Sequence, residues 1–185
     1  VFPSATETMA KSIAFCRDTL AADEIPVLLG YSLGRSQEIL AHLANAELPI
    51  MLHPRVEAVT RVYQKLGCKF PAYTSLAPMM AAGHVIIAPQ QSLNSELFTL
   101  IEPRRTAVLT GWAMDPSSRF RHATDAAFPL SDHADYPELL EFIERVNPSR
   151  IYTVHGFATE FAATLRSMGR EAWALGRTNQ LELGL

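Results

Sequence analysis

The feature that most constrains this fold is a regular alternation of short apolar runs with longer segments of helical periodicity. The apolar runs are bounded by Gly, Pro or polar residues, which is typical of buried strands. They lie at residues 26–31, 49–53, 85–88, 107–112, 127–130, 151–155 and 171–175. Helices are predicted between them, at residues 4–23, 34–45, 54–66, 93–101, 135–146 and 157–168. This alternation predicts an α/β fold with a mainly parallel sheet.

Two of the predicted helices begin with a capping pattern. Ser4 is followed three residues later by Glu7, and Asp135 in the same way by Glu138, so each pair can satisfy free amides of a first helical turn. The polar, Arg-bearing segment 114–124 shows no apolar periodicity and is predicted to be a loop.

The composition is that of a globular chain. Hydrophobic residues make up 48% of it and charged residues 19%. The sequence contains no run of about 18 apolar residues, which a membrane-spanning helix would need. Cys16 and Cys68 have no metal-binding spacing, which favours a reducing compartment and hence a cytoplasmic location.

The charge balance gives no global attraction to nucleic acid, because the formal net charge is −3. However, 13 of the 16 basic residues are Arg, whose planar fork suits phosphate. A local group of arginines is either a phosphate-facing patch or a solvated surface, and its members are Arg104, Arg105, Arg119 and Arg121.

Ligands of open α/β sheets bind at the carboxyl ends of the strands, so the residues that follow each apolar run are the candidates for a site. Three such ends carry polar chemistry: Gly30-Tyr31-Ser32-Leu33-Gly34-Arg35, Ser131-Asp132-His133-Ala134-Asp135, and His155-Gly156. The first matches G-x-S-x-G, so Ser32, Asp132 and His155 could form a serine-hydrolase triad in the expected chain order. The alternative is a glycine-rich turn whose amides, with Arg35, hold a phosphate or carboxylate.

The second and third ends act as a pair in this interpretation. His133 and His155 are separated by 22 residues, which contain one predicted helix and one predicted strand. That connection returns the chain to the same edge of the sheet, so we expect the two histidines to approach each other. A histidine at a strand end is suited to metal binding or to proton transfer.

These motifs resemble a known family. Leu130-Ser131-Asp132-His133-Ala134-Asp135-Tyr136, followed by Val154-His155-Gly156, is similar to the C-terminal motif pair of metallo-β-lactamase-fold nucleases with a β-CASP insertion. Gly34-Arg35-Ser36-Gln37-Glu38 resembles a turn near the start of that insertion. The nearest subgroup is that of bacterial ligase-associated proteins, also described as mRNA 3′-end processing exonucleases.

The resemblance implies a β-CASP-like lobe over residues 1–110 and the C-terminal part of a metallo-β-lactamase lobe over residues 111–185. It implies that His133 assists proton transfer or holds the scissile phosphate, and that His155 binds one zinc ion of a two-zinc centre. Asp132, next to His133, is expected to be a second catalytic residue, although many relatives have Ala or Gly there. Phosphate contacts are expected from the turn residues Gly34, Arg35, Ser36 and Gln37.

The main metal-binding motif of the family, H-x-H-x-D-H, is absent from this sequence. One histidine cannot hold a catalytic zinc, which needs about three protein ligands. We therefore expect this chain to be the C-terminal part of a longer zinc-dependent nuclease and to be inactive alone. The implied partners are DNA or RNA, an N-terminal metallo-β-lactamase half, and a DNA ligase or helicase system. The remaining alternative is a non-catalytic module that binds nucleic acid.

Overall fold

The computed structural model describes residues 2–115 and 117–176. It divides into two compact units, unit 1 (Val1–Ala134) and unit 2 (Asp135–Leu185), and each is described by itself. The predicted α/β fold is confirmed in both units. None of the described helices is long and apolar enough to cross a membrane.

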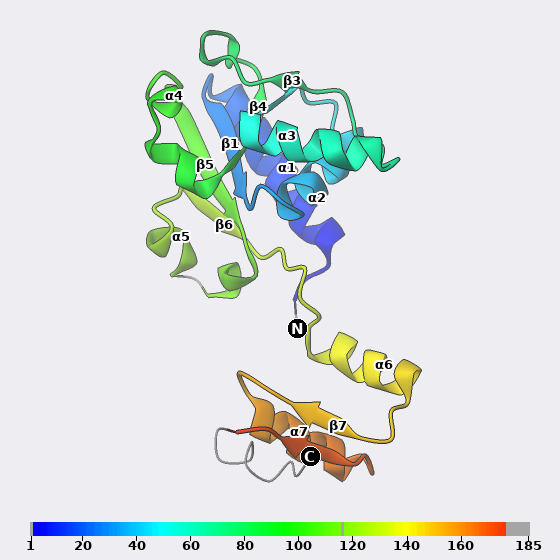
Figure 1. The fold of residues 1–185 in the computed structure, drawn as a ribbon. Helices are drawn as coiled ribbons and strands as arrows, with labels where there is room; N and C mark the ends of the chain where they lie inside the picture. The colour runs from blue at the N-terminus through cyan, green and yellow to red at the C-terminus, as the bar shows by residue number, and fades with distance from the viewer. Residues whose placement is uncertain (1, 116, 177–185) are drawn as a thin grey trace. The chain divides into compact units, whose positions relative to one another are not determined.

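Unit 1 is built on a six-stranded sheet in which every pair of neighbouring strands is parallel (Figure 1). The order of its strands is β3-β2-β4-β1-β5-β6. Their bounds are β1 Ile25–Gly30, β2 Ile50–Leu52, β3 Thr74–Ser75, β4 Val85–Pro89, β5 Arg104–Leu109 and β6 Ala126–Phe128. The sequence pattern missed β3 because two exposed residues at the edge of a sheet show no apolar run.

The longer helices of unit 1 follow the predicted order, whereas several short segments differ. A 3-10 helix over Pro78–Met80 was not predicted, and the strand predicted over residues 107–112 ends at Leu109 because Gly111–Met114 form a 3-10 helix. The α-helices are α1 Ala5–Ala21, α2 Arg35–His42, α3 Pro54–Lys65, α4 Glu96–Thr99 and α5 Ser118–Arg121, and the 3-10 helices are η1 Leu43–Asn45, η2 Pro78–Met80, η3 Gln90–Asn94 and η4 Gly111–Met114. The segment predicted as one helix over residues 93–101 is split, because the chain leaves helical geometry at Ser95. The segment 114–124, predicted as a loop, contains α5, which is a single turn of helix.

Two hydrophobic cores cover the two faces of this sheet. Alternate residues of β1 divide between them: Leu28 packs with α1, α2 and α3, whereas Val27 and Leu29 pack on the other face with Phe98 of α4. Side chains of neighbouring strand residues point to opposite faces, so burial on both faces requires a continuously apolar strand. This explains why β1 and β4 are buried at every position.

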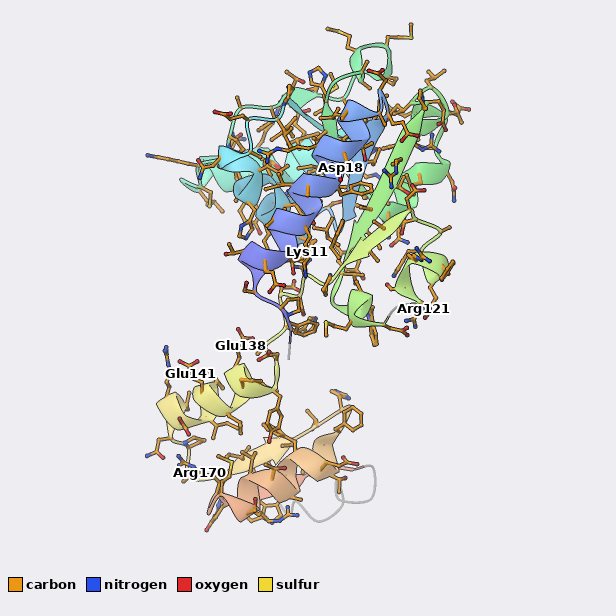
Figure 2. The ribbon with its side chains drawn as sticks, turned by 180° about the vertical axis from the view of Figure 1, so that it is seen from behind. Lys11, Asp18, Arg121, Glu138, Glu141 and Arg170 are labelled. Atoms are coloured by element: carbon orange, nitrogen blue, oxygen red, sulfur yellow. The ribbon has the colours of Figure 1, made fainter. Side chains whose placement is uncertain are left out.

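The α1 cap is confirmed in part. Ser4 Oγ accepts a hydrogen bond from the Glu7 backbone N–H at 3.1 Å. The Glu7 carboxylate pairs with Lys11 at 2.9 Å, one turn along the helix. Lys11 and Asp18 lie on the exposed side of α1 (Figure 2), whereas Met9 and Cys16 are buried against the sheet.

Unit 2 is a small α/β arrangement with its own core. It contains α6 Tyr136–Val146, β7 Ile151–Thr153, α7 Ala158–Ser167 and β8 Ala172–Ala174, and β7 and β8 are parallel neighbours. The core consists of Ile143, Ala162, Leu165 and Ala172. Asp135 and Glu138 cap α6 reciprocally, at 3.1 and 2.8 Å, as the sequence predicted.

Candidate functional site

The turn between β1 and α2 is shaped by two glycines. A Cβ at Gly30 would lie 2.7 Å from Arg35 Cγ, so only glycine lets the stem of Arg35 pass at this point. Gly34 has a φ of 81°, a conformation that favours glycine, and its N–H donates to Gln37 Oε1 at 2.8 Å. The turn therefore starts α2 and directs Arg35 back across the end of β1.

Two of the turn residues predicted to contact phosphate, Ser36 and Gln37, form side-chain hydrogen bonds with other groups of the protein. Ser36 Oγ donates to the Tyr31 carbonyl oxygen at 2.7 Å, and Gln37 Nε2 donates to Thr60 Oγ1 at 3.0 Å. Both side chains are buried. Direct phosphate contact from the Gly34–Gln37 turn stays a prediction, while the observed contacts give these side chains a structural role.

Arg35 links this turn to the segment that carries His133. Its side chain is only 4% exposed, and its Nη2 donates to Asp132 Oδ1 at 2.8 Å. Its Nη1 donates to Glu38 Oε2 at 2.6 Å. Arg35 Nε is buried and has no hydrogen-bond partner among the described residues. The two Nη atoms of one guanidinium group can bind two carboxylates at once. Arg35 therefore positions the Asp132 carboxylate while it also binds Glu38.

A cavity of about 340 Å³ lies at the carboxyl ends of three neighbouring strands, β1, β5 and β6. Gly111 packs closely against Ser131 at this cavity, because a Cβ there would lie 3.1 Å from Ser131 Oγ. His133 is exposed, and its backbone N–H donates to Ser131 Oγ at 3.1 Å. The lining residues are Phe2, Tyr31, Arg35, Thr110, Gly111, Trp112, Ser131, Asp132 and His133. Three of the predicted site residues, Arg35, Asp132 and His133, are thus brought together in unit 1.

Sequence reasoning missed Tyr31 and Trp112 as site residues. Tyr31 directly follows β1, and Trp112 lies shortly after the end of β5. Both side chains are largely exposed. A large aromatic residue immediately after a buried strand was the available signal, because these positions project at the ligand-binding edge of the sheet.

The geometry does not favour the serine-hydrolase triad. A nucleophile elbow holds its serine in a strained turn, but the positive φ in this turn belongs to Gly34, and Ser32 has none. The Asp132 carboxylate is bound by Arg35 instead of by a histidine. His155 follows β7, which pairs with β8 in a separate two-stranded sheet, so the predicted return of the chain to one sheet edge is wrong. The approach of His155 to Ser32, Asp132 or His133 stays a prediction, because His155 belongs to unit 2.

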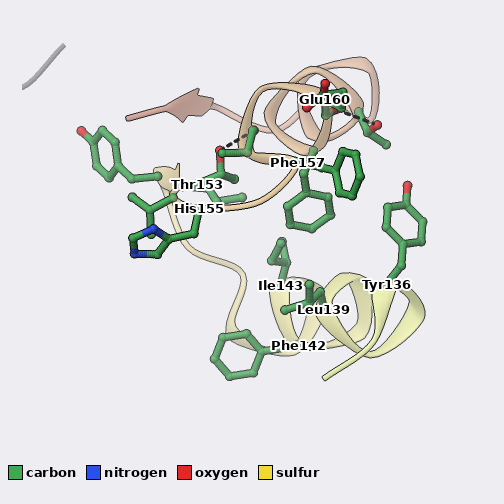
Figure 3. A pocket seen from close by; sticks show the side chains of 14 residues that line it. Tyr136, Leu139, Phe142, Ile143, Thr153, His155, Phe157 and Glu160 are labelled. Carbon is green, nitrogen blue, oxygen red and sulfur yellow. Dashed lines mark hydrogen bonds between the residues drawn. The ribbon is translucent and has the colours of Figure 1, made fainter. Parts of the chain in front are cut away.

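His155 occupies the turn between β7 and α7. Its φ is 65° and that of Gly156 is 54°, so two consecutive residues adopt the left-handed conformation. The side chain is exposed and lines an apolar groove of about 670 Å³ in unit 2. Leu139 and Ile143 of α6 project into this groove (Figure 3). A left-handed histidine is uncommon outside turns and is compatible with a ligand position.

The residues present do not form a zinc site on their own. Among the described residues no three His, Cys, Asp or Glu side chains gather closely enough to hold a metal ion. A catalytic zinc needs about three protein ligands, so a zinc-ligand role for His155 stays a prediction.

The four arginines proposed as a phosphate patch all have partners within unit 1. Arg104 donates to the Phe98 and Ile101 carbonyl oxygens and pairs with Glu102, and Arg121 pairs with Asp115. Arg105 lies over the Phe15 ring at 5.1 Å, and Arg119 over the Phe120 ring at 4.5 Å. These contacts favour the solvated-surface alternative.

Comparison with known families gives an independent finding. Residues 126–175 match the family described as "RMMBL: Zn-dependent metallo-hydrolase RNA specificity domain". This segment is therefore similar to RMMBL domains. The match contains both Asp132-His133 and His155, and it confirms the resemblance to β-CASP-associated metallo-hydrolases. The RMMBL description connects the chain with zinc-dependent hydrolases and with RNA.

A similar curated protein is described as a probable DNA ligase of Opitutus terrae. It is 54% identical over all 185 residues of this chain. The chain spans only 18% of the length of that protein. Its description agrees with the ligase-associated subgroup to which the sequence motifs pointed.

Proposed function

We propose that this chain is the RMMBL-containing part of a zinc-dependent nuclease that hydrolyses phosphodiester bonds of DNA or RNA. The observation that carries the proposal is the RMMBL match over residues 126–175, which includes His133 and His155. Both histidines are exposed at turns, where a substrate or a metal ion can reach them. Residues 1–110 are proposed as the β-CASP-like lobe and residues 111–185 as part of the metallo-β-lactamase lobe.

The proposed roles follow from the chemistry of the side chains. His133 holds the scissile phosphate or donates a proton to the leaving oxygen, since the ring nitrogens of an imidazole can donate hydrogen bonds and transfer protons. Asp132 is proposed as its catalytic neighbour, with Arg35 holding the carboxylate in place. His155 is proposed as one zinc ligand, and the remaining ligands come from an N-terminal metallo-β-lactamase half. We therefore propose that the chain alone does not cleave.

The partner proposal rests on the ligase-like relative. Because the whole chain aligns with part of a protein described as a probable DNA ligase, we propose that the nuclease works with a DNA ligase or helicase system in the cytoplasm. The nuclease would then trim ends that the partner enzyme joins or unwinds.

The test uses the polypeptide encoded by the complete reading frame and end-labelled single strands of DNA and of RNA. We expect cleavage that requires zinc and is abolished by a chelator. His133→Ala should keep the bound zinc but lose about 10²–10⁴-fold in rate, as expected for removal of an acid–base group. His155→Ala should lose zinc as well as activity.

His42→Ala is the matched control, because His42 is exposed at the end of α2 and lines neither the His133 cavity nor the His155 groove. Cleavage that persists in chelator, or full activity of His133→Ala, contradicts the proposal. Labelling of Ser32 by a fluorophosphonate would instead support a serine hydrolase. Strand binding by the complete protein without cleavage would support a non-catalytic module.

A further inference from the structure

Two exposed aromatic rings stand beside the cavity that contains His133. Tyr31 is 68% exposed and Trp112 is 73% exposed, and both line this cavity. They also line a second, smaller cavity of about 40 Å³, so the two hollows adjoin along these rings. Exposure of large apolar rings is unfavourable in water, which makes their joint placement here a sign of a ligand.

The backbone beneath both rings is firmly held. The Tyr31 carbonyl oxygen accepts hydrogen bonds from Ser36 N at 3.1 Å and from Ser36 Oγ at 2.7 Å. Trp112 lies in η4, where its carbonyl oxygen accepts from Asp115 N at 3.1 Å. β1 and β5 are paired neighbours, so both rings emerge at one edge of the sheet. The rings are therefore presented to solvent by a fixed scaffold, which limits the entropy lost on binding.

The polar groups of the larger cavity can bind a base beside the phosphate that His133 is proposed to hold. The Asp132 carboxylate is 67% exposed and lies at the cavity wall, where it can accept a hydrogen bond from an N–H donor. The positive charge of Arg35 is already shared between Asp132 and Glu38. A nucleobase has two apolar faces and edges that carry both N–H donors and acceptors, so it can stack on an aromatic ring while one of its N–H donors faces a carboxylate.

We propose that Tyr31 and Trp112 form a stacking site for unpaired bases of a single-stranded nucleic acid. The inference rests on the proposed function, since it describes how the strand is held next to His133. Bases in a duplex have both faces covered by their neighbours, so the site selects single strands over duplexes. Stacking is available to every base, so the selection is weakly dependent on sequence.

Binding is measured on the chain itself, which separates the test from cleavage. The probes are dA and rA strands of about 15 nucleotides, a length within the range that single-strand-binding folds cover. Trp173→Phe leaves Trp112 as the sole tryptophan, and the strands should quench its fluorescence. Trp112→Phe leaves Trp173, a half-exposed residue of unit 2 stacked on Tyr152, and its fluorescence should not change.

Affinity is measured with labelled probes in the wild-type background. Trp112→Leu and Tyr31→Leu should each weaken strand binding by about tenfold, in line with the loss of one stacked base. The dependence of affinity on salt should be unchanged, because neither variant removes a charge. Trp173→Leu is the matched control and should bind like the wild type. A duplex of the same sequence should bind more weakly than the single strand.

The inference is overturned if the chain binds no strand, if Trp112 is not quenched, or if both leucine variants bind like the wild type. If the leucine variants bind normally while the complete protein cleaves, the stacking site is wrong and the proposed function stands. If Trp112 is quenched but the complete protein does not cleave, the stacking site stands and the nuclease proposal fails.

Discussion

Replacing Arg35 by Met tests whether this residue organises the candidate site. The Arg35 guanidinium joins Glu38 on α2 to Asp132, which is 97 residues away along the chain. Methionine keeps an unbranched apolar stem next to Gly30 and removes both ion pairs. We expect a loss of stability together with a loss of order at Asp132 and His133.

The expected magnitude follows from exposure. Breaking a fully buried ion pair by removing one partner costs about 3–5 kcal/mol, whereas an exposed pair contributes about 0–1 kcal/mol. Here Arg35 is buried, but Glu38 and Asp132 are 31% and 67% exposed, so water can solvate both carboxylates once the guanidinium is gone. Each pair therefore contributes about 0.5–1 kcal/mol, and Arg35→Met should lower the free energy of unfolding by about 1–2 kcal/mol.

The assay is urea denaturation followed by circular dichroism, applied to Arg35→Met, Asp132→Asn and the double variant. The double-mutant cycle should give a coupling energy of about 0.5–1 kcal/mol between Arg35 and Asp132. Lys11→Met is the control, because Lys11 pairs with Glu7 on α1 and both side chains are largely exposed. A coupling energy of zero, or equal losses for Arg35→Met and Lys11→Met, would refute the positioning role.

Three further predictions concern unit 1. Gly30→Ala should destabilise the protein by about 1–3 kcal/mol, because the new Cβ meets Arg35 Cγ at 2.7 Å; an unchanged melting temperature would contradict this. Burial raises the pKa of the Cys16 thiol to about 12, so a thiol reagent at mildly alkaline pH should label only the exposed Cys68 until the protein is unfolded; two rapidly labelled thiols in the native protein would show otherwise. Burial, and secondarily Arg55, lowers the pKa of His53, whose Nδ1 accepts from the Arg55 N–H at the start of α3. The unfolded chain then binds more protons than the folded protein, so stability should fall as the pH drops below about 6.5. His53→Asn should remove this pH dependence, which is measured as the melting temperature at a series of pH values.

Much of the fold followed from local pattern. The apolar runs placed β1 and β4 because strands buried on both faces are apolar at every position. The α6 cap was predictable because its two hydrogen bonds join residues three apart in the sequence. Local signals failed at β3 and α5, which are too short to show a period.

The candidate site could be predicted only as a set of residue types. The sequence singled out Asp132, His133 and Arg35, and unit 1 brings them to one cavity. It also predicted phosphate contacts from Ser36 and Gln37, which the structure shows buried and bonded inside the protein. Burial of Gln37 depends on Thr60 of α3, and no pattern within α2 could reveal that contact.

What the sequence alone determined about this protein is the alternation of strands and helices, the caps, and the strand ends that carry Arg35, Asp132, His133 and His155. These are properties of short segments, and they follow from the side-chain periods of strands and helices. Only the tertiary structure decided that Arg35 forms ion pairs with Asp132 and Glu38. It also decided that Tyr31 and Trp112 remain exposed beside them. Ion pairing and exposure depend on which segments meet in space, so residues distant in sequence acquire their roles only when the sheet has formed.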